Sequence, residues 1–117
     1  MRVLVVDDNA LIRKMIRAVL DEEGVECHEA ADVASALSAL RDLKPDLCFL
    51  DQYMPDGEGF SVLKALQAWP QGNRPRVYLL TGSADESIAS QARQLGATGV
   101  LFKPVDPNLL IQKVRER

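Results

Sequence analysis

Acidic, hydroxyl and basic side chains follow four short apolar runs, each at the point where the run ends. These side chains are Asp7 and Asp8 after residues 2–6, Asp51 after 47–50, Thr81 after 77–80 and Lys103 after 99–102. Apolar runs of this length are typical of buried parallel strands. The carboxyl ends of parallel strands meet at one edge of an open α/β sheet, where ligands bind. Three carboxylates, one hydroxyl and one amine are therefore predicted to form one site.

This combination of groups favours a particular chemistry. Clustered carboxylates repel one another, so the site favours a cation, and hard oxygen ligands with spare positions for water suit Mg²⁺. A lysine and a hydroxyl beside a metal-bound carboxylate suit a phosphoryl group, whose oxygens need positive charge and hydrogen-bond donors. The residues thus indicate a site for a divalent cation and a phosphoryl group.

Helical patterns separate the strands that must position these groups. Strands are expected at 2–6, 25–30, 47–50, 77–80 and 99–102, and helices from Asn9 to Gly24, from Asp32 to Leu43, over 60–69, over about 85–95 and from Pro107 onward. Asp8 or Asn9 is expected to cap the first helix, and Asp32 the second. Parallel strands need right-handed crossovers, which place helices on both faces of the sheet. The pattern predicts an α/β fold.

Length and composition narrow the class of protein. A chain of 117 residues fits a single domain over residues 1–117, and 47% hydrophobic residues are enough for a packed core. The net charge of −3 gives no basic field for direct binding of nucleic acid. No apolar run approaches the length of a membrane span, and the N-terminus shows no secretory leader. We expect a soluble, cytoplasmic protein that contacts no membrane.

Taken together, the motifs resemble the receiver domain of two-component response regulators, and the resemblance covers essentially the whole chain. Its motifs are Asp7-Asp8, the segment LDQYMPDGEGF from Leu50 to Phe60, Thr81-Gly82 and Lys103-Pro104. The resemblance implies a flavodoxin-like, doubly wound five-stranded parallel sheet with strand order 2-1-3-4-5 and helices on both faces. That order places the strands that end before Asp7 and at Asp51 side by side.

The resemblance also implies roles in phosphoryl transfer. Asp51 matches the phosphoacceptor, and a carboxylate is a competent nucleophile toward phosphorus. Thr81 matches the hydroxyl that donates to a phosphoryl oxygen, and Lys103 matches the lysine that pairs with the phosphoryl group. The Lys103-Pro104 motif implies a cis peptide bond. Gly57 and Gly59 are expected to let the loop beside the site adopt positive φ.

The metal ligands are implied in the same way. Asp7 and Asp8 match the acidic pair of the family, with Asp8 as a direct ligand and Asp7 acting directly or through water. Asp51 and the backbone carbonyl of Tyr53 complete the protein ligands. Mg²⁺ keeps several waters and takes few carboxylates, which suits this arrangement.

One position departs from the family pattern. An aromatic residue commonly lies three positions before the lysine, and here that residue is Val100. Valine has no large ring to move between exposed and buried states, so the usual coupling to the surface of the last helices is in doubt. Phe102 is not expected to replace it, on the reasoning that adjacent strand residues point to opposite faces.

Three further sets of residues lie outside these motifs. Leu11, Ile12 and Met15 form a wide apolar front beside the site, which is either a docking surface for the phosphodonor or simply part of the core. Cys27 and Cys48 are expected to be free thiols, because the implied strand order puts another strand between them. His28 offers too few partners for a structural zinc site and is expected to be an ordinary strand residue.

The leading functional hypothesis is a signalling domain switched by phosphorylation at Asp51. Its partners would be a sensor histidine kinase or a histidine phosphotransfer protein, and a downstream protein or an attached output domain. It would catalyse only its own phosphorylation and dephosphorylation. The alternative is a degenerate receiver that acts as a phosphorylation-independent interaction module. A small aspartate-nucleophile phosphatase is disfavoured because Gln52-Tyr53 supplies no second acid, and a cofactor binder because no phosphate-cradling glycine loop follows the first strand.

Overall fold

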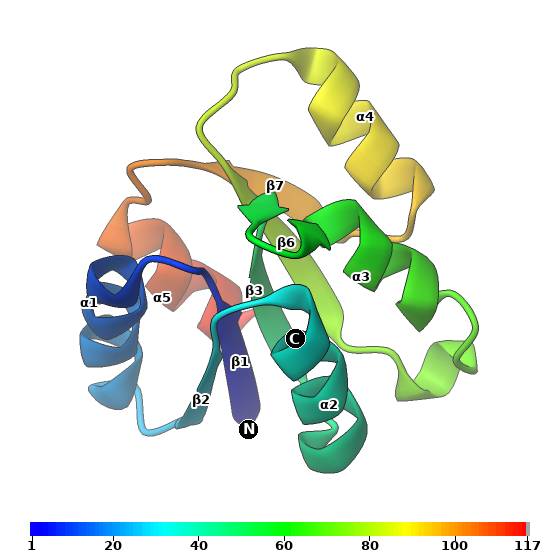
Figure 1. The fold of residues 1–117 in the computed structure, drawn as a ribbon. Coiled ribbons are helices and arrows are strands. Elements are labelled where there is room, and N and C mark those ends of the chain that lie inside the picture. Colours follow the sequence, from blue (N-terminus) through cyan, green and yellow to red (C-terminus); the bar gives the residue numbers. More distant parts are fainter. Residues whose placement is uncertain (117) are drawn as a thin grey trace.

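Five parallel strands form the central sheet of this protein, in a computed structural model that describes residues 1–116. Their order across the sheet is β2-β1-β3-β6-β7 (Figure 1). The strands are β1 (Arg2–Val6), β2 (Glu26–Ala30), β3 (Leu47–Asp51), β6 (Arg76–Thr81) and β7 (Gly99–Phe102). Counted along this sheet alone, the order is 2-1-3-4-5, so the predicted flavodoxin-like topology is confirmed.

Helices cover both faces of the sheet, as predicted (Figure 1). The helices are α1 (Ala10–Asp21), α2 (Val33–Leu43), α3 (Gly59–Leu66), α4 (Glu86–Gln94) and α5 (Pro107–Arg115). Alternate strand residues enter two hydrophobic cores, because successive side chains of a strand point to opposite faces. One core is built with α1 and α5, through Ile16, Leu20, Leu110 and Val114. The other is built with α2, α3 and α4, through Ala36, Leu40, Val62, Leu63 and Ala92.

Side-chain caps explain where the helices begin. Asn9 Oδ1 accepts hydrogen bonds from the amides of Leu11 and Ile12, and Asp32 accepts from Ser35 in a capping box. Of the two candidate caps for α1, Asp8 and Asn9, the structure uses Asn9, and the predicted cap Asp32 of α2 is confirmed. Helix α3 is shorter than the expected 60–69, since the amides of Ala68 and Trp69 donate to carbonyls three residues back and tighten into turns. A short 3₁₀ helix, η1 (Gln71–Asn73), lies in the expected loop after it.

A two-stranded antiparallel ribbon follows β3 and was not predicted. It pairs β4 (Tyr53–Met54) with β5 (Gly57–Glu58). At its turn, the Asp56 carboxylate accepts hydrogen bonds from the amides of Val33 (2.8 Å) and Ala34 (3.1 Å) at the start of α2. The ribbon is thus fixed to α2, which holds the segment after Asp51 in a defined position.

The cysteines and the histidine have the ordinary roles that were expected. Cys27 in β2 and Cys48 in β3 are free and buried, with β1 between their strands. Burial raises the pKa of the Cys27 thiol to about 11 and that of Cys48 to about 12, which keeps both as protonated thiols at neutral pH. His28 Nε2 lies 2.7 Å from a carboxylate oxygen of Glu26 on the same strand.

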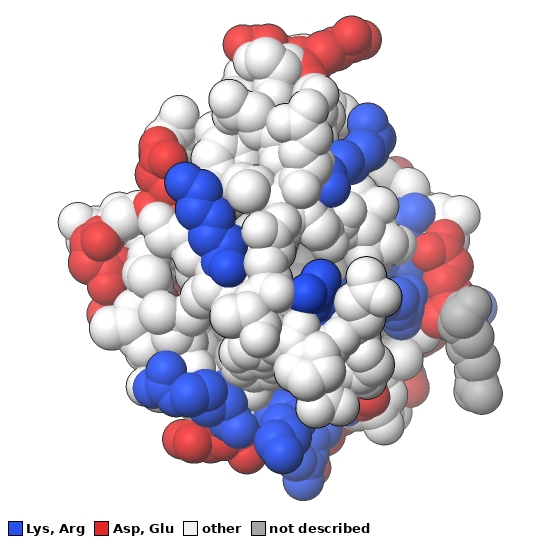
Figure 2. Space-filling view, turned by 90° about the vertical axis from the view of Figure 1, so that its right-hand side faces the viewer, with Lys and Arg blue, Asp and Glu red and all other residues white. Residues whose placement is uncertain are grey.

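The surface carries no extended basic area on the face that Figure 2 shows, which is the side of α3 and α4 in Figure 1. Over most of this face the Lys and Arg side chains are separated by uncharged atoms, some gather along its lower edge beside an acidic group, and other acidic groups lie toward the edges. Within residues 1–116, every helix is too short or too polar to cross a membrane.

Candidate functional site

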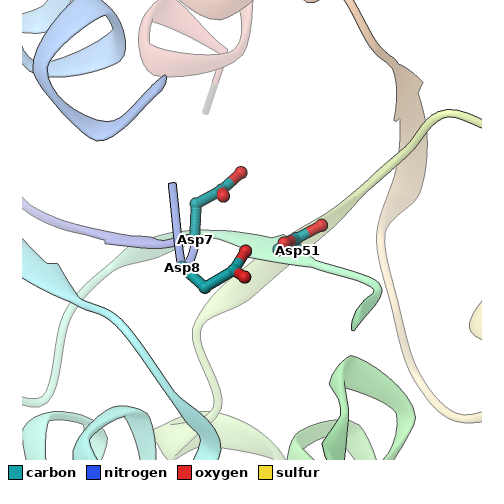
Figure 3. A group of neighbouring side chains, drawn as sticks. All are labelled: Asp7, Asp8 and Asp51. Carbon is teal, nitrogen blue, oxygen red and sulfur yellow. The ribbon is translucent and has the colours of Figure 1, made fainter. Parts of the chain in front are cut away.

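Three carboxylates meet at the carboxyl edge of the sheet. Asp7 and Asp8 follow β1, Asp51 ends β3, and these strands are neighbours through the pairing of Val6 with Leu50. One oxygen from each carboxylate lies within 4.8 Å of the others (Figure 3). Asp7 is fully buried and Asp51 is 6% exposed, whereas Asp8 faces solvent. The strand ends therefore bring together the acidic groups, as the sequence indicated.

Lys103 joins this cluster from the end of β7. Its Nζ donates to Asp7 Oδ2 at 2.8 Å and to Asp51 Oδ1 at 3.0 Å. The ammonium bridges two of the three carboxylates, so an excess of negative charge remains in the cluster. Hard carboxylate oxygens with excess negative charge fit Mg²⁺, and the residues present suit that ion.

The environment perturbs the ionisation of the bridging groups. Burial raises the pKa of Asp51, the charges of Asp7 and Asp8 add to this, and the hydrogen bond from Lys103 opposes it. Burial alone would lower the pKa of the Lys103 ammonium, but the hydrogen bonds to Asp7 and Asp51 outweigh it and the pKa lies above its ordinary value. Lys103 therefore stays charged at neutral pH, while ionised Asp51 is destabilised by its surroundings.

A cavity of about 440 Å³ opens over this edge of the sheet. Its lining consists of Asp8, Asp51, Gln52, Tyr53, Thr81, Gly82, Ser83 and Lys103. It brings together the groups expected around a phosphoryl group, whereas Asp7 is fully buried beside it. Tyr53 also lines the cavity and is 61% exposed. The role of its backbone carbonyl as a metal ligand stays a prediction.

Thr81 ends β6 and makes a buried hydrogen bond that was not predicted from the sequence. Its hydroxyl donates to Gln52 Oε1 at 2.5 Å and accepts from the amide of Ser83 at 3.1 Å. Gln52 is 4% exposed and Thr81 is 1% exposed, so the pair is buried. The strand register gives the reason, because Asp51 pairs with Leu80 and the next residues face each other. The implied strand order made these two strands neighbours, but the register that pairs Gln52 with Thr81 comes from the structure.

Gly59 packs directly on the backbone of Asp51. Its amide donates to the carbonyl of Gln52 at 2.8 Å, and a Cβ at this position would lie 2.5 Å from the Asp51 carbonyl oxygen. Gly57 has a positive φ of 155°, whereas the φ of Gly59 is not positive. The expectation of positive φ at Gly59 was therefore wrong, and the close approach of Gly59 to the backbone of Asp51 is what excludes a side chain there.

The end of β7 differs from one expectation. Val100 packs against the core of α2, α3 and α4, whereas Leu101 belongs to the opposite core. Phe102 is two residues from Val100, so strand alternation puts it on the same face as Val100, and the reason given for discounting it was wrong. Its side chain is 51% exposed at the strand end. The following Lys103–Pro104 peptide bond is cis, as the resemblance implied.

The apolar front of α1 is partly a surface feature. Leu11 is 76% exposed and Met15 is 42% exposed, so the interpretation as core residues is wrong for both. Ile12 is partly buried and packs against the core of α1 and α5. Two apolar side chains thus remain on the surface of the helix that starts beside the acidic cluster.

The fold and the site define a doubly wound α/β protein with an acidic, lysine-bridged cavity at the carboxyl edge of its sheet. The family model for the response regulator receiver domain matches residues 3–115. The chain belongs to this family, and the predicted family resemblance is confirmed.

Relatives and solved structures agree with this assignment. The chain is 33% identical over 114 residues to the phosphate regulon transcriptional regulatory protein PhoB of Escherichia coli, covering 97% of this chain and 50% of PhoB. It is 34% identical over 116 residues to the DNA-binding response regulator MtrA of Mycobacterium leprae, covering 99% of this chain and 50% of MtrA. The chain therefore spans about half the length of these curated relatives. The chemotaxis response regulator CheY4 of Vibrio cholerae superimposes with a TM-score of 0.89 at 32% identity, covering 97% of this chain and 95% of that chain.

Proposed function

We propose that this chain acts as one phosphoacceptor domain, in which Asp51 takes a phosphoryl group from a phosphohistidine. The observation that supports this best is the position of Lys103 Nζ, which contacts both Asp7 and Asp51 at a cavity also lined by Thr81. The ammonium and the hydroxyl supply the charge and the donor that phosphoryl oxygens need. As a member of the receiver family, the chain belongs to a class of signalling switches. Transfer of a phosphoryl group to Asp51 is the chemistry that we propose for this switch.

The residues of the site would share the work of transfer. A carboxylate oxygen of Asp51 attacks phosphorus, and the phosphorus–nitrogen bond of the donor breaks. The imidazole, protonated on its other ring nitrogen, leaves with the bonding electrons as a neutral ring. Lys103 stays protonated and would neutralise a phosphoryl oxygen, while Thr81 would donate to another. Asp8, Asp51 and the Tyr53 carbonyl would hold Mg²⁺, and Asp7 would bind it directly or through water. The ion would neutralise further charge on the phosphoryl group. The open cavity later admits the water that hydrolyses the acyl phosphate.

The proposed partners follow from the surface and the relatives. Leu11 and Met15, exposed on α1 beside the site, would contact a sensor histidine kinase or a histidine phosphotransfer protein. PhoB and MtrA are named as a transcriptional regulatory protein and a DNA-binding regulator, so we propose that the signal passes to an attached output domain or a separate protein. The free, buried cysteines fit a reducing compartment, and we assign the domain to the cytoplasm.

The test is phosphorylation by a small donor. The protein is incubated with Mg²⁺ and acetyl phosphate, and its intact mass is measured beside that of Asp51→Asn. One phosphate adduct on the wild type and none on Asp51→Asn is the expected result. An adduct that persists in Asp51→Asn would contradict the assignment, and no adduct on the wild type would favour the phosphorylation-independent interaction module.

A further inference from the structure

The buried hydrogen bond between Gln52 and Thr81 conflicts with the role proposed for Thr81. A hydroxyl has one proton, and that of Thr81 is donated to Gln52 Oε1. Thr81 cannot donate the same proton to a phosphoryl oxygen at Asp51. Binding of the phosphoryl group therefore requires that the hydrogen bond to Gln52 break.

The same hydroxyl also fixes the loop that leads to α4. Thr81 Oγ1 accepts from the Ser83 amide at 3.1 Å, and Ser83 Oγ accepts from the Asp85 amide at 3.2 Å. Asp85 in turn caps α4, because its Oδ1 accepts from the Ser87 amide at 2.9 Å. A continuous set of hydrogen bonds thus runs from Gln52 through Thr81 to the first turn of α4.

We propose that Gln52 is a positioning residue that holds Thr81 in its resting orientation, so that phosphoryl binding releases Thr81 and the loop into α4. The inference rests on the proposed phosphoacceptor function. It gives the chain a two-position element that does not depend on a ring at Val100. A ligand shifts such an equilibrium only by its differential interaction with the two positions. Gln52 stabilises only the resting one, so it opposes binding at Asp51.

The test is the variant Gln52→Met, which keeps the approximate size of the side chain and removes the acceptor. Beryllofluoride, which mimics the acyl phosphate on a carboxylate, is titrated in the presence of Mg²⁺. Loss of a hydrogen bond made only in the resting state should tighten beryllofluoride binding by about 2- to 12-fold, the range that one net hydrogen bond represents. The exposed Gln112→Met on α5 makes the same chemical change elsewhere and should show no tightening.

A double-mutant cycle separates this role from a general structural effect. In the Thr81→Val background the hydroxyl is absent, so adding Gln52→Met should not tighten binding further. An NMR spectrum should also show the Ser83 amide shifting in Gln52→Met toward its position in the beryllofluoride complex. An equal gain with and without the Thr81 hydroxyl would overturn the inference, as would weaker binding in Gln52→Met.

The role of Gln52 and the phosphoacceptor function of Asp51 can be refuted separately. Wild-type protein that binds beryllofluoride, together with Gln52→Met that binds it with unchanged affinity, refutes only the role of Gln52. Wild-type protein that binds no beryllofluoride refutes the phosphoacceptor function and the inference with it.

Discussion

Replacing Gly59 by alanine should disturb Asp51, the proposed phosphoacceptor, without touching any side chain of the site. The new Cβ would lie 2.5 Å from the Asp51 carbonyl oxygen and 3.0 Å from a methyl carbon of Leu79. Real Cβ atoms essentially never approach a heavy atom closer than 3.0 Å, so the backbone of Asp51 must move by about 0.5 Å or more. The Asp51 carbonyl oxygen belongs to the backbone of a buried strand. It cannot move aside as the end of a flexible side chain could.

This displacement should lower both the stability of the fold and the rate of phosphorylation. Overpacking of a tight interior typically destabilises by about 1–3 kcal/mol. For a domain of this size each kcal/mol lowers Tm by about 3–6 °C, so Gly59→Ala should lower Tm by about 3–18 °C. A 1 Å misplacement of reacting groups costs on the order of 100-fold in rate, and about 0.5 Å corresponds to roughly 10-fold. Phosphorylation by acetyl phosphate should slow by about that factor at temperatures where the variant is folded.

Thermal unfolding followed by circular dichroism, and the rate of phosphate incorporation followed by intact mass, measure the two effects. Gly72→Ala is the matched control, since a Cβ at Gly72 meets no atom of residues 1–116 within 4 Å. A Gly59→Ala protein with the Tm and the phosphorylation rate of Gly72→Ala would refute the argument that close approach to Asp51 requires glycine.

Three further predictions concern charge and contact at the site. Asp8→Ala should weaken Mg²⁺ binding in calorimetry and raise Tm without metal, because a repelling carboxylate is lost; unchanged Mg²⁺ affinity would contradict its role. Because the pKa of Asp51 is raised, the folded state holds the carboxyl proton of Asp51 more tightly than the unfolded chain does. The free energy of unfolding therefore falls as pH rises past the ordinary pKa of an aspartate, about 3.9. Denaturant titrations should therefore show Asp51→Asn more stable than wild type at pH 7 and equally stable near pH 3; a constant difference would refute this. Leu11→Ala should slow transfer from a histidine phosphotransfer protein but not from acetyl phosphate, and equal slowing would point to damage at the site.

The sequence was sufficient to predict the sheet and the meeting of its acidic groups. Each strand is a short apolar run, and parallel topology forces the carboxyl ends of such runs to one edge. Asp7, Asp51 and Lys103 therefore lie together although 96 residues separate the first from the last. The caps at Asn9 and Asp32 were equally predictable, because capping depends on local chemistry.

Contacts between segments distant in sequence were less predictable. The strands β4 and β5 have two residues each, too few to show an alternating pattern. Asp56 accepts from the amides at the start of α2, which lie 22 and 23 residues earlier in the chain. The pairing of Gln52 with Thr81 depends on strand register and on burial of an amide, and neither leaves a periodic signal. The need for glycine at Gly59 likewise arises from a tertiary approach to Asp51.

Mapping of the modified residue tests whether Asp51 is the phosphoacceptor. The protein is phosphorylated with Mg²⁺ and phosphoramidate, whose phosphorus–nitrogen bond mimics that of phosphohistidine. Borohydride then reduces the acyl phosphate, which leaves homoserine at the modified position, and peptide sequencing by mass spectrometry locates it. We expect homoserine at position 51, with Asp7 and Asp8 retained as aspartate. Homoserine at either of those two positions, or at none of the three, would contradict it.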